Sequence, residues 1–140
     1  MFRLVIDTSV IIAALLSQRG ASYRLVMMID KGLWQTCLSV PLLMEYESVA
    51  KRPEVGITLS HADIDVVLDY VCDWTEHRQI YFLWRPLLPD PGDDCVLEVA
   101  VEAQCDFIIS YNKRDLVGAE RFGIAVVTPP EFLSVLEQSK

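Results

Sequence analysis

The stretch LVIDTSVII, residues 4–12, places one carboxylate, Asp7, in an otherwise apolar run and follows it directly with Thr8 and Ser9. A carboxylate that loses hydration in such surroundings needs compensation from hydrogen bonds, a strand end or a cation. The run before Asp7 is typical of a buried strand, and the apolar segment from Ser9 is typical of a helix. The stretch therefore predicts a strand that ends at Asp7 and a helix that opens directly behind it.

The same alternation of a β-rich run and a helical or turn pattern continues along the chain. The β-rich runs are FRLVID (2–7), LWQTCLSV (33–40), QIYFL (79–83), DFIIS (106–110) and GIAVV (123–127). Such alternation predicts a three-layer α/β/α fold with a central, mostly parallel sheet. Reciprocal caps are expected where Ser60 precedes Asp63 and where Thr128 precedes Glu131.

Length and composition favour one globular domain over residues 1–140. A hydrophobic fraction of 52% argues against disorder, and no apolar run is long enough to span a membrane. No signal peptide is recognisable, so the expected location is the cytoplasm. Four scattered cysteines without a CxxC pair make zinc an unexpected ligand.

The formal net charge of −8 argues against a broad basic surface that binds nucleic acid. A net charge averages over patches, however, and acids that converge on divalent cations would be neutralised locally. The charge therefore leaves open a nucleic-acid substrate that is handled through metal.

Four acidic residues lie at or just after predicted strands, where parallel α/β sheets place their working residues. They are Asp7, Glu45, Asp94 and Asp115. Each has a structural alternative: Asp7 as an N-cap, Glu45 as a boundary residue of its helix, Asp94 as an acid that complements a helix dipole, and Asp115 as a solvated turn residue. Taken together they would meet at one sheet edge, where their mutual repulsion favours a bound cation. All-oxygen ligands indicate Mg²⁺ or Mn²⁺.

Helical periodicity ranks the other acids near Asp94. Counting 100° per residue places Glu98 and Glu102 toward the polar side of the helix that follows the third predicted strand. Asn112 is expected either to orient a neighbouring carboxylate or to cap the turn that contains Asp115.

Four motifs in this order resemble the PIN-domain family, and more narrowly its VapC-like toxin ribonucleases. The motifs are VIDTS (5–9), PLLMEY (41–46), PDPGDDCVLEVA (89–100) and IISYNKRDL (108–116), and the likeness extends from Phe2 to about Leu136. The resemblance implies a nuclease whose acidic quartet, Asp7, Glu45, Asp94 and Asp115, binds Mg²⁺ or Mn²⁺ and cleaves RNA. In the same comparison Thr8 or Ser9 occupies the hydroxyl position behind the first acid, and Asn112 the polar position of the last motif.

The resemblance also implies supporting residues and partners. Lys113 and Arg114 are candidates for binding a substrate phosphate, although solvated loop charges are the alternative, and Arg52 and Arg85 are weaker candidates. A protein antitoxin is the expected partner, and the apolar segment 21–29 is a candidate dimer surface.

Two alternatives from other classes remain open at this point. A receiver-type phospho-acceptor domain also combines a parallel sheet, clustered acids and Mg²⁺, but it needs an acceptor Asp after a middle strand, and LWQTCLSV ends without one. A catalytically silent module that binds RNA or protein would have no reason to keep four mutually repelling acids. The absence of GxxxxGK and GxGxxG disfavours nucleotide kinases and dinucleotide enzymes.

Overall fold

A computed structural model describes residues 1–79 and 91–139, except for the side chains of residues 91–94. The described strands are β1 (Arg3–Ile6), β2 (Gln35–Leu38), β3 (Glu76–His77), β4 (Phe107–Ile109) and β5 (Ala125–Val127). The α-helices are α1 (Thr8–Leu16), α2 (Ala21–Met27), α3 (Val40–Ala50), α4 (His61–Asp73), α5 (Pro91–Glu102) and α6 (Pro129–Gln138). Short 3-10 helices are η1 (Ile29–Lys31), η2 (Pro53–Val55) and η3 (Lys113–Phe122).

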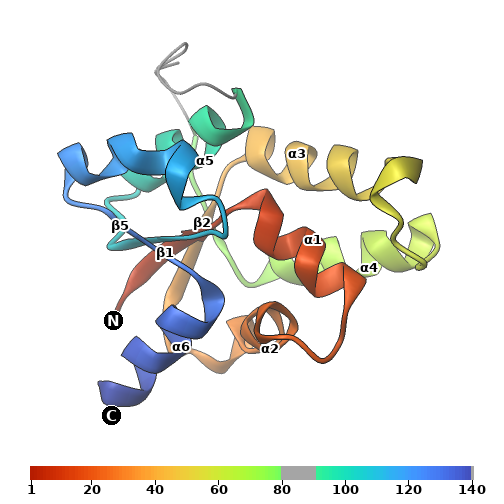
Figure 1. Cartoon of the computed structure of the whole chain (residues 1–140), viewed down its shortest axis with the longest axis horizontal. Helices are drawn as coiled ribbons and strands as arrows, with labels where there is room; N and C mark the ends of the chain where they lie inside the picture. The colour runs from red at the N-terminus through yellow and green to blue at the C-terminus, as the bar shows by residue number, and fades with distance from the viewer. Residues whose placement is uncertain (80–90, 140) are drawn as a thin grey trace.

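The described strands form one parallel sheet in the order β3-β2-β1-β4-β5. Figure 1 shows α3 and α5 on one side of these strands, and α2 and α6 on the other. The predicted three-layer α/β fold with a parallel sheet is therefore confirmed. Because β1 lies at the centre, both of its faces are covered, and Leu4, Val5 and Ile6 are each 0% exposed.

The edge strand next to β2 lies earlier in the chain than the strand predicted at residues 79–83. β3 is the polar pair Glu76–His77, whose register partners are Cys37 and Leu38. The run QIYFL was predicted as a strand; Gln79 lies outside any strand, and residues 80–83 fall outside the described part of the chain. Two polar residues carry no alternation that a sequence pattern could detect, since their pairing depends on the neighbouring strand.

Local chemistry explains where the helices begin. Thr128 and Glu131 form the predicted capping box of α6: the Thr128 hydroxyl accepts the Glu131 N–H at 3.4 Å, and the Glu131 carboxylate accepts the Thr128 N–H at 2.8 Å. Ser60 caps α4 by accepting the N–H of Asp63 at 3.1 Å, but the reciprocal half of the predicted cap, from the Asp63 side chain, is not formed. Ser39 does the same for α3 by accepting the N–H of Leu42 at 3.3 Å. Each cap satisfies an N–H that the helix itself leaves without a partner.

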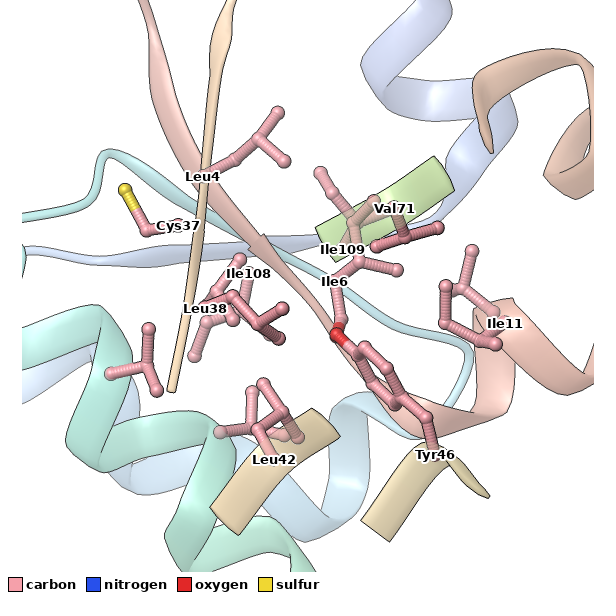
Figure 2. Packing of buried hydrophobic residues seen from close by; sticks show 14 of the residues in the cluster. Leu4, Ile6, Ile11, Cys37, Leu38, Leu42, Tyr46, Val71, Ile108 and Ile109 are labelled. Carbon is pink, nitrogen blue, oxygen red and sulfur yellow. The ribbon is translucent and has the colours of Figure 1, made fainter. Parts of the chain in front are cut away.

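The core is built from the central strands and the helices on both faces. Figure 2 shows Leu42 and Tyr46 of α3 directed toward the strand residues Ile6 and Leu38. On the other face, the fully buried ring of Phe132 in α6 makes an edge-on contact with Trp34 at a centroid distance of 5.3 Å. Such pairs add to the stabilisation from burial and hold the helices in fixed positions over the sheet.

Arg3 and Glu76 form a charged pair at the amino end of the sheet, and their contacts link elements of the fold. The Arg3 guanidinium donates to the Ala103 carbonyl at 2.9 Å and to Glu76 at 2.5 Å. The hydrogen bond to Glu76 raises the pKa of Arg3 and, in the reverse direction, lowers the pKa of Glu76. These contacts join β1, β3 and the end of α5, which leaves the opposite edge, where the strands end, as the place for a reactive site.

Candidate active site

Asp7 lies at the carboxyl end of β1, in the N-cap position of α1. Its side chain makes no capping hydrogen bond to the helix, and the residue is only 4% exposed. Its backbone N–H donates to the Ile109 carbonyl at 2.9 Å, which continues the pairing between β1 and β4 by one residue. The alternative in which the Asp7 side chain caps α1 is therefore wrong, and another interaction must compensate for burying this carboxylate.

Two serine hydroxyls supply that compensation. Asp7 Oδ2 accepts a hydrogen bond from Ser9 Oγ at 2.9 Å and one from Ser110 Oγ at 2.6 Å. The shorter of these distances is typical of a strong hydrogen bond between a hydroxyl and a carboxylate. Ser110 is 0% exposed, so this contact is shielded from competing water. The two serines hold the carboxylate in one orientation.

The orientation of each hydroxyl is set by a second hydrogen bond. Ser110 Oγ accepts the Asn112 N–H at 2.9 Å, and Ser9 Oγ accepts the Tyr111 N–H at 3.3 Å. Because each oxygen already accepts a backbone proton, its own proton is free to point at Asp7. The backbone of residues 111 and 112 thus makes both serines donors toward the carboxylate.

Sequence reasoning missed Ser110. It follows β4 as Asp7 follows β1, and the register pairs Ile6 with Ile109, so the two residues face each other across adjacent strands. The signal that could have found it is the serine that closes the run DFIIS. That signal becomes informative only when β4 is known to be the neighbour of β1.

Tyr111, the residue after Ser110, is partly exposed to solvent. Its side chain is 45% exposed, while its hydroxyl lies 2.7 Å from the hydroxyl of Ser22, a residue of α2 that is 2% exposed. The phenol is therefore tied to α2 at one end, and its backbone is tied to Ser9 at the other. This ring lies at the same edge of the sheet as Asp7.

Tyr46 fixes α3 against the strand that carries Asp7. The residue is 1% exposed, and its hydroxyl donates to the Ile6 carbonyl (Figure 2). Burial raises the pKa of Tyr46 well above its ordinary value, and the negative charge of Asp7 adds to the rise. The hydroxyl therefore stays protonated at neutral pH, and it serves as a donor to the backbone next to Asp7.

The other candidate acids occupy three different elements. Glu45 is half-buried in α3, one residue before Tyr46, and Asp115 is half-buried in the first turn of η3. Asp94 lies in the first turns of α5, but its side chain falls outside the described part. Within the described residues no group of three His, Cys, Asp or Glu side chains could hold a metal ion, so Asp7, Glu45 and Asp115 do not form such a group alone.

The supporting residues are also placed. Ser9, rather than Thr8, contacts Asp7, and Thr8 is half-buried. Asn112 caps no helix with its side chain, so the capping role suggested for it is wrong; its backbone N–H holds Ser110. Arg114 is exposed.

Lys113 is engaged at the start of α6. Its ammonium group lies 2.6 Å from Glu131 Oε1, within the capping box of that helix. This ion pair, together with hydrogen bonds from Thr128, lowers the pKa of Glu131 to about 2. In this arrangement the Lys113 charge is directed at a helix terminus of the protein, whereas Arg114 remains directed at solvent.

One expectation about α5 is wrong. Glu98 was placed toward the polar side of this helix, yet it is 2% exposed, while Glu102 is exposed. The arc calculation assumed a single covered face, but α5 contacts η3 and α3 as well as the central strands. A helix that is covered on several sides buries residues which a one-faced pattern assigns to water.

The chemistry of Asp7 fits a divalent cation. Its carboxylate is held in place through Oδ2, and the described residues donate no hydrogen bond to Oδ1. A rigid carboxylate at the carboxyl edge of a parallel sheet is the kind of oxygen ligand that Mg²⁺ and Mn²⁺ take.

None of the helices in residues 1–79 and 91–139 combines the length and apolar character needed to cross a membrane. A comparison with curated proteins gives no match to the chain. The family profile of the PIN domain matches residues 3–114, a segment that includes β1, three of the four acidic residues and the whole Asp7 serine network, and that ends one residue before Asp115. This match confirms the resemblance of the sequence motifs to the PIN-domain family, and it favours a nuclease over a receiver domain. The chain belongs to the PIN domain family, whose members are generally nucleases.

Proposed function

We propose that this protein is a Mg²⁺- or Mn²⁺-dependent endoribonuclease that acts in the cytoplasm as the toxin of a toxin–antitoxin pair. The observation that carries the proposal is Asp7, a buried carboxylate at a strand end that two serine hydroxyls hold in one orientation without using it as a helix cap. A structural aspartate would use its oxygens for the backbone of α1. Asp7 instead presents a carboxylate whose orientation the protein has fixed from two sides.

The residues take the following proposed roles. Asp7 would hold the cation, with Asp94 and Asp115 as further ligands. Glu45 would orient the attacking water, and Arg114 is the better placed of the two basic residues to contact a substrate phosphate, because Lys113 is paired with Glu131. When bound, a divalent ion in such a site lowers the pKa of water and stabilises charge on the phosphate oxygens. The chain supplies rigid placement of the carboxylate, through Ser9 and Ser110.

A charge-neutral substitution tests the proposal. Asp7→Asn keeps the volume of the side chain and its ability to accept hydrogen bonds, so the fold should persist while cleavage of a single-stranded RNA in Mn²⁺ falls by at least about 100-fold. Asp69→Asn is the matched control, because Asp69 is an exposed residue of α4. Asp94→Asn and Asp115→Asn should also lose cleavage, whereas Asp69→Asn should keep it.

Purified parent and variants are compared by gel electrophoresis of an end-labelled RNA, and manganese uptake is measured by calorimetry. Cleavage in Asp7→Asn equal to that of the parent would show that the activity comes from a contaminant or from another site. A parent that takes up no manganese and cleaves no RNA would refute the proposal as a whole.

The toxin role adds a partner. A groove of about 450 Å³ lies between the end of α1, α2 and the start of α4, and it is lined largely by apolar side chains such as Leu15, Val26 and Val67. We propose an antitoxin as the partner of this chain, and this groove, which includes part of the segment 21–29, as the surface that would take a segment of it. Expression of the parent in bacterial cells should stop growth and Asp7→Asn should not; equal growth with both would refute the toxin role.

A further inference from the structure

The exposed ring of Tyr111 is the feature that the proposed chemistry leaves unexplained. Four aromatic rings of the described part pair with one another in the core, namely Phe2, Trp34, Phe107 and Phe132. Tyr111 takes part in none of these ring pairs, and its side chain is 45% exposed. An aromatic ring in water at the edge that carries Asp7 loses the benefit of burial, so its position calls for a reason.

The ring is exposed but not loose. Its hydroxyl is held at 2.7 Å by Ser22, a buried residue of α2, and its backbone N–H donates to Ser9. Ser9 in turn donates to Asp7, so one chain of hydrogen bonds runs from α2 through Tyr111 to the carboxylate. The ring is thereby fixed relative to the reactive edge before any substrate arrives, which lowers the entropy cost of a contact with it.

The hydrogen bond to Ser22 also limits what Tyr111 can do. Because the phenol oxygen is already engaged, its role is less suited to proton transfer than to contact through the ring. The substrate of a nuclease offers one group that matches a flat apolar surface, namely the face of an unpaired base. In a duplex that face is covered by the neighbouring base pairs, so only a single-stranded segment can use the ring.

The charge of the protein makes such a contact valuable. With 20 acidic and 12 basic residues, the chain has a formal charge of −8, and it attracts a polyanion only weakly. Of the two basic residues next to Asp115, Lys113 is paired with Glu131, so it is less available for a phosphate. Stacking is largely independent of charge, and it would supply affinity that phosphate contacts do not.

We propose that Tyr111 is a stacking platform for an unpaired base next to the scissile phosphate, and that it makes the site selective for single-stranded nucleic acid. The inference rests on the proposed nuclease function, because it assumes that the substrate strand passes Asp7. It assigns to Tyr111 a positioning and specificity role through its ring alone.

The test separates stacking from charge by removing every base. Binding of a fluorescein-labelled single-stranded RNA decamer is measured by fluorescence anisotropy in EDTA, where no cleavage occurs, alongside an abasic decamer of equal length and charge. Tyr111→Leu keeps an apolar side chain but removes the ring, and it should weaken binding of the RNA roughly 5- to 150-fold while leaving the abasic strand within about twofold. Tyr111→Phe keeps the ring and should stay within about threefold of the parent on both strands.

Two control variants sharpen the comparison. Arg114→Ala should weaken binding of both decamers by the same factor, since it removes only a phosphate contact. Trp74→Ala removes another exposed ring, which is 53% exposed and precedes β3 at the opposite edge of the sheet, and it should change neither affinity. Thermal unfolding of each variant shows whether a loss of binding reflects a loss of fold.

The proposal is overturned if Tyr111→Leu binds the RNA as tightly as the parent, or if it weakens the RNA and the abasic strand equally. The same decamer incubated with the parent and Mn²⁺ tests the proposed function separately. If the parent cleaves the RNA but Tyr111→Leu has no base-dependent effect on binding, only the stacking proposal is wrong. If Tyr111→Leu weakens binding of the RNA alone but the parent cleaves no RNA, Tyr111 is a base-binding surface and the proposed nuclease function is wrong.

Discussion

Replacing Ser110 by alanine isolates the contact that holds Asp7. The Ser110 hydroxyl is fully buried, donates to Asp7 Oδ2 at 2.6 Å and accepts the Asn112 N–H at 2.9 Å. A hydrogen bond to a charged group contributes about 1.5–3 kcal/mol, and the exposed Asn112 can exchange its lost partner for water at little cost. Ser110→Ala should therefore lower the free energy of unfolding by about 2–3 kcal/mol, most of it through Asp7.

A double-mutant cycle with Asp7→Asn separates this contact from any general damage. An asparagine at position 7 is a neutral acceptor, so Ser110→Ala should cost only about 1 kcal/mol in that background. The difference gives a coupling energy of about 1–2 kcal/mol between the two residues. Urea unfolding at pH 7, followed by circular dichroism, measures all four proteins, and the single Ser110→Ala change should lower the midpoint by about 1 M.

The control is Ser60→Ala, which removes the cap of α4 but has no link to Asp7. It should cost about 1 kcal/mol and be additive with Asp7→Asn. If Ser110→Ala cost the same in both backgrounds, within about 0.3 kcal/mol, its hydroxyl would not be bonded to the side chain of residue 7, and the account of how Asp7 is held in place would be wrong.

Two further predictions concern the surroundings of the site. Tyr46→Phe removes the donor to the Ile6 carbonyl and should lower the free energy of unfolding by about 1–3 kcal/mol in urea, because the buried carbonyl loses its partner; an unchanged midpoint would contradict the contact. Lys113→Ala should raise the pKa of Glu131 from about 2 toward its ordinary value, measured by NMR titration. Since this pKa is depressed in the folded protein, the pair stabilises the fold above about pH 4.5, and its contribution disappears as the pH falls toward 2. In Lys113→Ala, stability should depend less on pH over that interval, and an identical dependence would count against the pair.

Much of the fold could be predicted because local signals agreed with the global pattern. Thr128 and Glu131 mark the start of α6 by a spacing that only a helix terminus uses, and the apolar run before Asp7 indicates a strand buried on both faces. β3 could not be found in this way. Its two residues are polar, and their pairing with Cys37 and Leu38 depends on where α4 delivers the chain.

The site was predicted in part for a related reason. Asp7 is conspicuous in the sequence, since a carboxylate in an apolar run needs an explanation. Ser110 is not, because a serine after a strand is common and its meaning depends on the parallel register between β1 and β4. Glu98 was assigned to water because helical periodicity describes one covered face, whereas α5 is covered by several neighbours. The role of Ser110 and the burial of Glu98 both depend on contacts between elements that are distant in the sequence, which a local pattern does not contain.

The placement of β1 between β2 and β4 has a consequence for how the protein is made. During synthesis the ribosome releases residues 3–38 early, so β1 and β2 can pair while the remainder is still being translated. Asp7, however, receives its tightest donor only when Ser110 has emerged. A nascent chain that ends before this serine therefore carries the carboxylate without the hydrogen bond that orients it in the complete fold.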